Sequence, residues 1–108
     1  MKRHGIALAA VLFAAGSAHA ALDNTAALAL MQKNGCIACH AIDKKVVGPA
    51  YQDVAAKYKG DKDALAKLSD KVKKGGSGVW GSIPMPPNTQ VSDADIKNLV
   101  SWILTLKK

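Results

Sequence analysis

The sequence predicts an all-α fold of about four helices, and three observations support that prediction. Apolar residues recur at helical spacing near the C-terminus, glycine and proline separate the periodic segments, and no stretch alternates convincingly as a β-strand does. The chain has 108 residues and no internal repeat. This length suits one small domain with a thin core.

Residues 1–20 are predicted to be a cleaved Sec signal peptide. Basic residues open the segment, residues 6–15 form a short apolar core, and residues 18–20 read Ala-His-Ala, a small-x-small cleavage site. The alternative is an uncleaved anchor, but the apolar stretch is shorter than the roughly 18 residues that a spanning helix needs. Cleavage leaves residues 21–108 as the mature domain, in which no segment is apolar enough to span a membrane.

Two helices are expected in the first half of the mature domain. The first is capped by Asp23 or Asn24 and ends at Gly35. A glycine–proline pair then breaks the chain, because proline lacks an amide donor and glycine tolerates unusual dihedral angles. A second, short helix follows over residues 51–58.

Two further helices are expected in the second half. One runs over residues 61–74 with Asp61 as its cap, and its predicted apolar face consists of Leu65, Leu68 and Val72. The last begins at Ser92, which forms a capping-box-like pair with Asp95. Its apolar residues fall at i, i+3, i+4, i+7 and i+8, which makes a broad stripe; they are Ile96, Leu99, Val100, Ile103 and Leu104.

The most informative motif is the run of Cys36, Cys39 and His40. Two cysteines at i and i+3 followed directly by histidine are the pattern for attaching a c-type haem. Two thioether bonds to one porphyrin need sulfurs about one helical turn apart, and the next residue can then ligate the iron. The alternatives are a redox-active disulfide, which expects a βαβ pattern nearby, and a zinc site, which wants four ligands.

Export and the motif support each other. Haem is attached to c-type proteins outside the bacterial cytoplasm, so the sequence predicts a periplasmic protein. Removal of residues 1–20 also removes every other histidine and leaves His40 as the one imidazole of the mature domain. If an imidazole binds the iron, His40 supplies it.

Met85 is the predicted second axial ligand. A methionine in this position favours electron transfer, whereas an open position favours oxygen chemistry or gas binding. Met31, the other methionine of the mature domain, lies on the helix entering the motif and is poorly placed to reach the opposite face. Prolines on both sides of Met85 restrict the loop that presents it. The alternative is that Met85 only fills the core.

The charge of the chain bears on its partners. The formal net charge is +7, and removal of Lys2 and Arg3 with the leader lowers it to +5. The mature domain then has no arginine, the residue that best reads phosphate and base edges, so we expect no nucleic-acid partner. Its lysines form either a scattered solvated surface or a patch that steers an acidic protein partner.

Three blocks together resemble the bacterial cytochrome c-551 family, also called cytochrome c8, which consists of small class I cytochromes c. The blocks are residues 36–40, residues 47–51 (Val-Gly-Pro-Ala-Tyr) and residues 78–88 (Gly-Val-Trp-Gly-Ser-Ile-Pro-Met-Pro-Pro-Asn). The resemblance implies a compact class I fold, with about four helices around one covalently attached low-spin haem. It also implies His40 and Met85 as axial ligands.

The resemblance implies further roles around the iron. The Pro49 carbonyl would accept a hydrogen bond from His40 Nδ1–H. The indole N–H of Trp80 would reach a haem propionate, and the Asn88 side chain would bond near the sulfur of Met85. The alternatives are turn-forming roles for Pro49 and Asn88 and a core role for Trp80.

We expect electron transfer and not enzymatic catalysis. The resemblance implies a soluble periplasmic monomer that takes electrons from a quinol-oxidising complex and delivers them to nitrite reductase, a terminal oxidase or cytochrome peroxidase. The rivals are a haem enzyme or sensor that releases Met85, and a haem-binding subunit of a larger complex. Ser82 and Lys71 stand where relatives often have proline and arginine. Because of these two differences, the resemblance does not imply a value for the reduction potential.

Overall fold

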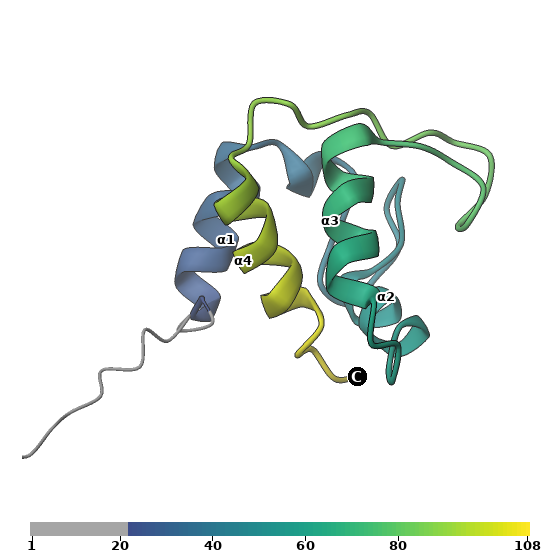
Figure 1. The fold of residues 1–108 in the computed structure, drawn as a ribbon, viewed down its shortest axis with the longest axis horizontal. Helices are drawn as coiled ribbons and strands as arrows, with labels where there is room; N and C mark the ends of the chain where they lie inside the picture. The colour runs from purple at the N-terminus through teal and green to yellow at the C-terminus, as the bar shows by residue number, and fades with distance from the viewer. Residues whose placement is uncertain (1–21) are drawn as a thin grey trace, which may run out of the picture.

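The computed structural model describes residues 22–108, and it confirms the all-α prediction (Figure 1). Within this range the β pairing is limited to two isolated bridges. The predicted signal peptide, residues 1–20, lies outside the described residues. The elements are α1 (Asn24–Lys33), the 3₁₀ turn η1 (Cys36–Ala38), α2 (Tyr51–Lys57), α3 (Ala64–Lys74) and α4 (Asp93–Ile103).

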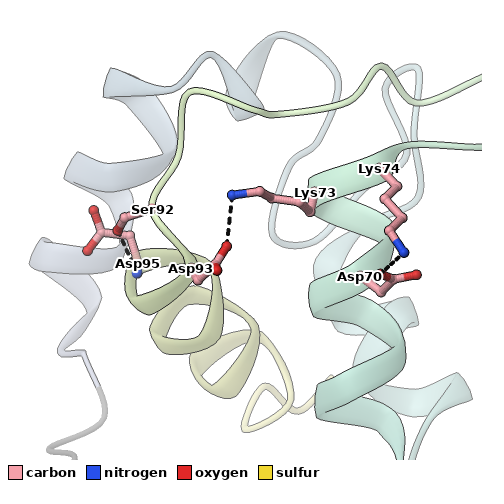
Figure 2. Close-up of polar contacts among 6 residues, drawn as sticks. All are labelled: Asp70, Lys73, Lys74, Ser92, Asp93 and Asp95. Atoms are coloured by element: carbon pink, nitrogen blue, oxygen red, sulfur yellow. Dashed lines mark hydrogen bonds and ion pairs between the residues drawn. The ribbon is translucent and has the colours of Figure 1, made fainter.

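The predicted caps of the first and last helices are confirmed. The Asp23 carboxylate accepts a hydrogen bond from Ala26 N at 2.7 Å. Ser92 Oγ accepts one from Asp95 N at 3.1 Å, as Figure 2 shows. Each oxygen satisfies an amide that has no partner within its helix, so these two helices begin where their sequences predict.

The third helix begins later than predicted. Helix α3 starts at Ala64, and the Asp61 carboxylate instead accepts from Asp63 N at 2.8 Å and from Lys67 Nζ at 2.9 Å. An aspartate that bonds the amide two residues on stabilises a turn and not a helix cap. The expected inward position of Leu65 is also wrong, since 38% of its surface is exposed while Ala64 is buried.

Helix α4 is the centre of the hydrophobic core. One face of α4 packs with α1 and α2, and the other packs with α3. Helices α1 and α4 lie against each other (Figure 1), and Trp102 Nε1 donates to Asn24 Oδ1 at 2.9 Å across that contact. The first cluster contains Ala27, Met31, Tyr51, Val54, Leu99, Trp102 and Ile103; the second contains Val91, Ile96 and Val100.

A long loop over residues 75–91 connects α3 to α4 and projects beyond the helices before it returns (Figure 1). Near its base, Lys73 Nζ pairs with Asp93 Oδ1 at 2.8 Å between the two helices (Figure 2). Both side chains are well exposed, so this ion pair adds little to stability. No helix in residues 22–108 has the length and hydropathy needed to cross a membrane.

Candidate functional site

A cavity of about 450 Å³ opens between the helices and the loop 75–91, and its walls are mainly apolar. Its volume falls in the range of roughly 300–1,000 Å³ that is typical of cofactor sites. The structure brings all the predicted site residues to this cavity: Cys36, Cys39, His40, Pro49, Trp80, Met85 and Asn88. Met31 is absent from its lining and is 1% exposed in the core.

The cysteines are presented by η1, directly after α1 turns at Gly35. Gly35 has φ of 75°, a conformation that favours glycine. The Cys36 carbonyl accepts from Cys39 N at 3.1 Å and from His40 N at 2.9 Å, which folds the motif into one turn. Both thiols are free and half-buried. Burial raises the pKa of Cys36, while a hydrogen bond with the Tyr51 hydroxyl acts in the opposite direction.

The His40 ring is held by a backbone hydrogen bond. Its Nδ1 lies 2.8 Å from the Pro49 carbonyl oxygen. A carbonyl oxygen only accepts, so Nδ1 carries the proton and donates it. In the neutral imidazole this leaves Nε2 with a free lone pair, which is the form that binds metals.

Close packing also restricts the His40 ring. The Tyr51 ring stacks on it with centroids 4.9 Å apart and planes 19° apart. Gly48 also lies close to the ring, and an added Cβ there would stand 2.5 Å from Cε1 of the imidazole. Only glycine leaves room for the ring at that position.

Met85 is held through its backbone by Gly76, which lies two residues beyond the end of α3. Its N–H donates to Gly76 O at 2.8 Å, and its carbonyl accepts from Gly76 N at 3.0 Å. Gly75 has φ of 73°, and a Cβ there would collide with the Met85 carbonyl. The glycine pair that ends α3 thus also positions the methionine.

Asn88 ties the far side of the same loop to α3. Its backbone N–H donates to Val72 O at 3.0 Å, and its side-chain Nδ2 lies 3.2 Å from both Val72 O and Pro86 O. Among the described residues, no hydrogen bond joins Asn88 to the sulfur of Met85. That contact stays a prediction, and the tie to α3 is the role that the geometry provides.

Trp80 lies at the mouth of the cavity and is 42% exposed. Lys57 Nζ, from the last turn of α2, lies 5.6 Å from its ring centroid, a cation–π distance. The predicted bond from Trp80 to a propionate stays a prediction. Lys71 also lines the cavity and is a second cation near its mouth.

Sequence reasoning missed several residues around the predicted ligands. Tyr51 was assigned no role, although an aromatic residue two positions after the Gly48–Pro49 break could have suggested one. The pairing of Gly76 with Met85 and the contact of Lys57 with Trp80 carry no local signal. The first contact spans nine residues of one loop and the second joins α2 to that loop, so both depend on how the loop folds.

The residues that line the cavity fit a covalently attached haem. Two free thiols, an imidazole with a free Nε2 and a thioether meet in one mainly apolar space. This is the donor set of a c-type haem with histidine and methionine ligands. The imidazole and the methionine loop come close to the backbone at Gly48 and Gly75. A larger residue at either position would clash with them.

Comparison with known proteins gives a consistent result. Residues 25–107 match the family model described as cytochrome c. The chain is 55% identical over 103 residues to cytochrome c-552 of Nitrosomonas europaea, covering 95% of this chain and 94% of that one. It is 55% identical over 78 residues to cytochrome c-551 of Pseudomonas aeruginosa, covering 72% and 74%.

Solved structures agree with the sequence comparison. The crystal structure of wild-type Nitrosomonas europaea cytochrome c552 matches with a TM-score of 0.72 and 61% identity, over 74% of this chain and 99% of that one. The class 1 cytochrome MtoD of Sideroxydans lithotrophicus matches with a TM-score of 0.69 and 40% identity, over 79% and 97%. The predicted class I fold is thereby confirmed.

Proposed function

This chain belongs to the cytochrome c family, and we propose that it is a soluble periplasmic carrier of single electrons with His40 and Met85 as the axial ligands of one c-type haem. Thioether bonds from Cys36 and Cys39 would attach the haem. The observation that carries the proposal is the single apolar cavity in which both thiols, the free Nε2 of His40 and Met85 meet.

The protein's part in this function is to keep both ligands in place. When bound, the haem supplies an iron that alternates between the ferric and ferrous states. The Pro49 carbonyl orients the imidazole and raises its basicity through the Nδ1–H bond. The backbone pairing of Met85 with Gly76 holds the thioether, and the apolar walls exclude water. A rigid, dry site needs little rearrangement when its charge changes.

Exposed apolar side chains near the cavity mouth provide a surface for transient redox partners. They are Val47, Val79, Trp80 and Ile83. Lys57 and Lys71 supply positive charge there, which speeds encounter with an acidic partner. The proposed donor is a quinol-oxidising complex, and the proposed acceptors are nitrite reductase, a terminal oxidase or cytochrome peroxidase. The protein would act as a monomer.

Export belongs to the same proposal. Residues 1–20 carry the pattern of a signal peptide, and the haem motif needs attachment outside the cytoplasm. The N-terminal sequence of the protein isolated from a periplasmic fraction tests this step. A start at Ala21 supports it, and a protein that retains residues 1–20 in the cytoplasm contradicts it.

Substitution of Met85 tests the ligand assignment. In the ferric holoprotein we expect a weak absorbance band near roughly 695 nm, the region associated with methionine–iron ligation. Met85→Ala should abolish this band, whereas Met31→Leu should keep it, because Met31 is buried in the core and leucine conserves its volume. A redox titration of the wild type should show a reversible one-electron transition.

Two results would contradict the electron-carrier proposal. One is rapid binding of carbon monoxide by the untreated ferrous protein, which would show an open coordination position. The other is loss of the band in Met31→Leu together with its retention in Met85→Ala. Size-exclusion chromatography of the native extract separates a free carrier from a subunit of a larger complex.

A further inference from the structure

The contact between Tyr51 and His40 has no part in the assignments made so far. The two rings stack with centroids 4.9 Å apart at an interplanar angle of 19°. Stacking at this distance adds a favourable interaction beyond the area that it buries. The contact therefore restricts a ring that must point Nε2 in one direction.

Tyr51 is a rigid support for that ring. It is 6% exposed and belongs to the core cluster that joins α1, α2 and α4. It is the first residue of α2, and its N–H donates to Ala41 O at 2.9 Å. Both its backbone and its side chain are thus fixed, so the position of its ring follows the packing of the whole core.

The imidazole has three close neighbours, which are Tyr51, Gly48 and Pro49. The hydrogen bond to Pro49 fixes one atom of the ring and leaves rotation about the Nδ1–O direction open. Stacking on Tyr51 opposes that rotation, and the close approach of Gly48 limits it further. The three contacts together leave one orientation.

We propose that Tyr51 is a positioning residue for the axial imidazole, because its ring sets the orientation of His40 and so the strength of the Nδ1–H bond to Pro49. The inference rests on the proposed function in that His40 is taken as the iron ligand. A stronger Nδ1–H bond makes the imidazole a more basic ligand. Basic ligands favour the ferric state, so loss of the Tyr51 ring should raise the reduction potential.

Tyr51→Phe and Tyr51→Leu in the holoprotein separate the ring from the hydroxyl. Phenylalanine keeps the stacked ring, and leucine removes it while keeping apolar volume. Trp102→Leu is the control, because it removes a ring from the same core cluster but does not line the cavity. It reports what a loss of core stability does by itself.

Three measurements compare the variants with the wild type. Solvent exchange of the His40 Nδ1 proton, followed by NMR in the ferrous state, should be roughly twofold to tenfold faster in Tyr51→Leu. Its His40 ring protons should move downfield as the tyrosine ring current is lost. Its potential should become more positive. Tyr51→Phe and Trp102→Leu should leave all three near wild type.

The outcomes separate this inference from the proposed function. If the wild type lacks the band expected of methionine ligation, the ligand assignment fails whatever the Tyr51 variants do. If the wild type shows the band but Tyr51→Leu keeps the wild-type exchange rate and potential, the positioning role is wrong and the proposed function stands. Equal changes in Tyr51→Leu and Trp102→Leu also overturn it, since they would trace to core stability.

Discussion

At the scale of single residues, glycines leave the space that larger neighbouring residues occupy. Gly48 and Gly75 each lie where a Cβ would strike a neighbour, the imidazole of His40 in one case and the backbone of Met85 in the other. The sequence predicted Gly48 only as part of a chain break and Gly75 only as the residue that follows the third helix. Their second role, which is to admit a ligand, depends on which residue the fold brings against them.

Substitution of Gly48 by alanine tests this role. A methyl group there would overlap the His40 ring, so Gly48→Ala should lower the free energy of unfolding by about 1–3 kcal/mol and shift the His40 ring resonances. Denaturant unfolding and NMR of the holoprotein measure the two effects. Gly60→Ala is the control: its φ of 82° adds strain, but no atom lies within 4 Å of the added methyl. Unshifted His40 resonances in Gly48→Ala would contradict the steric argument.

At the scale of elements, the loop 75–91 depends on α3 for its shape. Its later part is tied to α3 by Asn88 on the Val72 carbonyl, and within the loop Met85 pairs with Gly76, two residues beyond the helix. The prolines beside Met85 reduce the freedom of the unfolded loop, but they do not decide where it lies. The helix supplies that position.

Asn88→Ala should loosen the loop. Loss of the side-chain bonds to Val72 and Pro86 should cost about 1–2 kcal/mol of stability. The band assigned to methionine ligation should also disappear at lower denaturant concentration than in the wild type. Thr89→Ala, at an exposed neighbouring position, is the matched control. A variant that keeps the wild-type midpoint for loss of the band would show that Asn88 does not brace the ligand.

The turn before α3 should make a contribution to stability that depends on pH. The hydrogen bond from Lys67, followed by that from the Asp63 amide, lowers the pKa of Asp61. The folded pKa then lies below the unfolded one, so this contribution to stability is complete above the ordinary carboxyl pKa. It is lost as pH falls through the lowered value.

An NMR titration of the Asp61 carboxyl measures the effect directly. Lys67→Met should return its pKa toward the ordinary carboxyl value, because the main cause of the shift is removed. Lys62→Met changes a nearby exposed lysine and should leave the pKa as in the wild type. A pKa that is insensitive to Lys67 would place the cause elsewhere.

At the scale of the whole molecule, the cavity separates parts of the protein that would otherwise pack together. Its walls come from the motif, α2, α3, α4 and the long loop, and its volume of about 450 Å³ is large for so small a domain. Protein interiors are normally close-packed, so an apolar space of this size, whose lining lacks packing partners, is costly to keep open. A bound haem would supply the missing apolar surface.

The protein without attached haem should therefore be poorly folded. Cys36→Ala combined with Cys39→Ala removes both attachment points, and we expect a marked loss of helical signal in far-ultraviolet circular dichroism. Ile37→Ala is the control, since Ile37 lies between the cysteines and is 51% exposed. A fully native spectrum from the double variant would contradict the prediction and show that the core is sufficient by itself.

The sequence by itself determined most of the elements and the types of side chain proposed as ligands. Caps at Asp23 and Ser92, breakers and apolar stripes act over a few residues, so their consequences can be predicted from order along the chain. The haem motif is local for the same reason, since its two sulfurs and imidazole fall within one turn. The start of α3 was the local exception, because the Asp61 carboxylate can bond either a turn or a helix end.

The tertiary structure alone decided how the ligands are held. The stack of Tyr51 on His40 and the contact of Lys57 with Trp80 join different segments of the fold, and the pairing of Gly76 with Met85 closes the long loop on itself. Such contacts cannot be predicted from residue type and spacing. The contacts form only when the helices pack and the long loop returns across the cavity. The order of residues along the chain indicates which side chains could bind the iron. The packing of the fold decides how firmly those side chains are held.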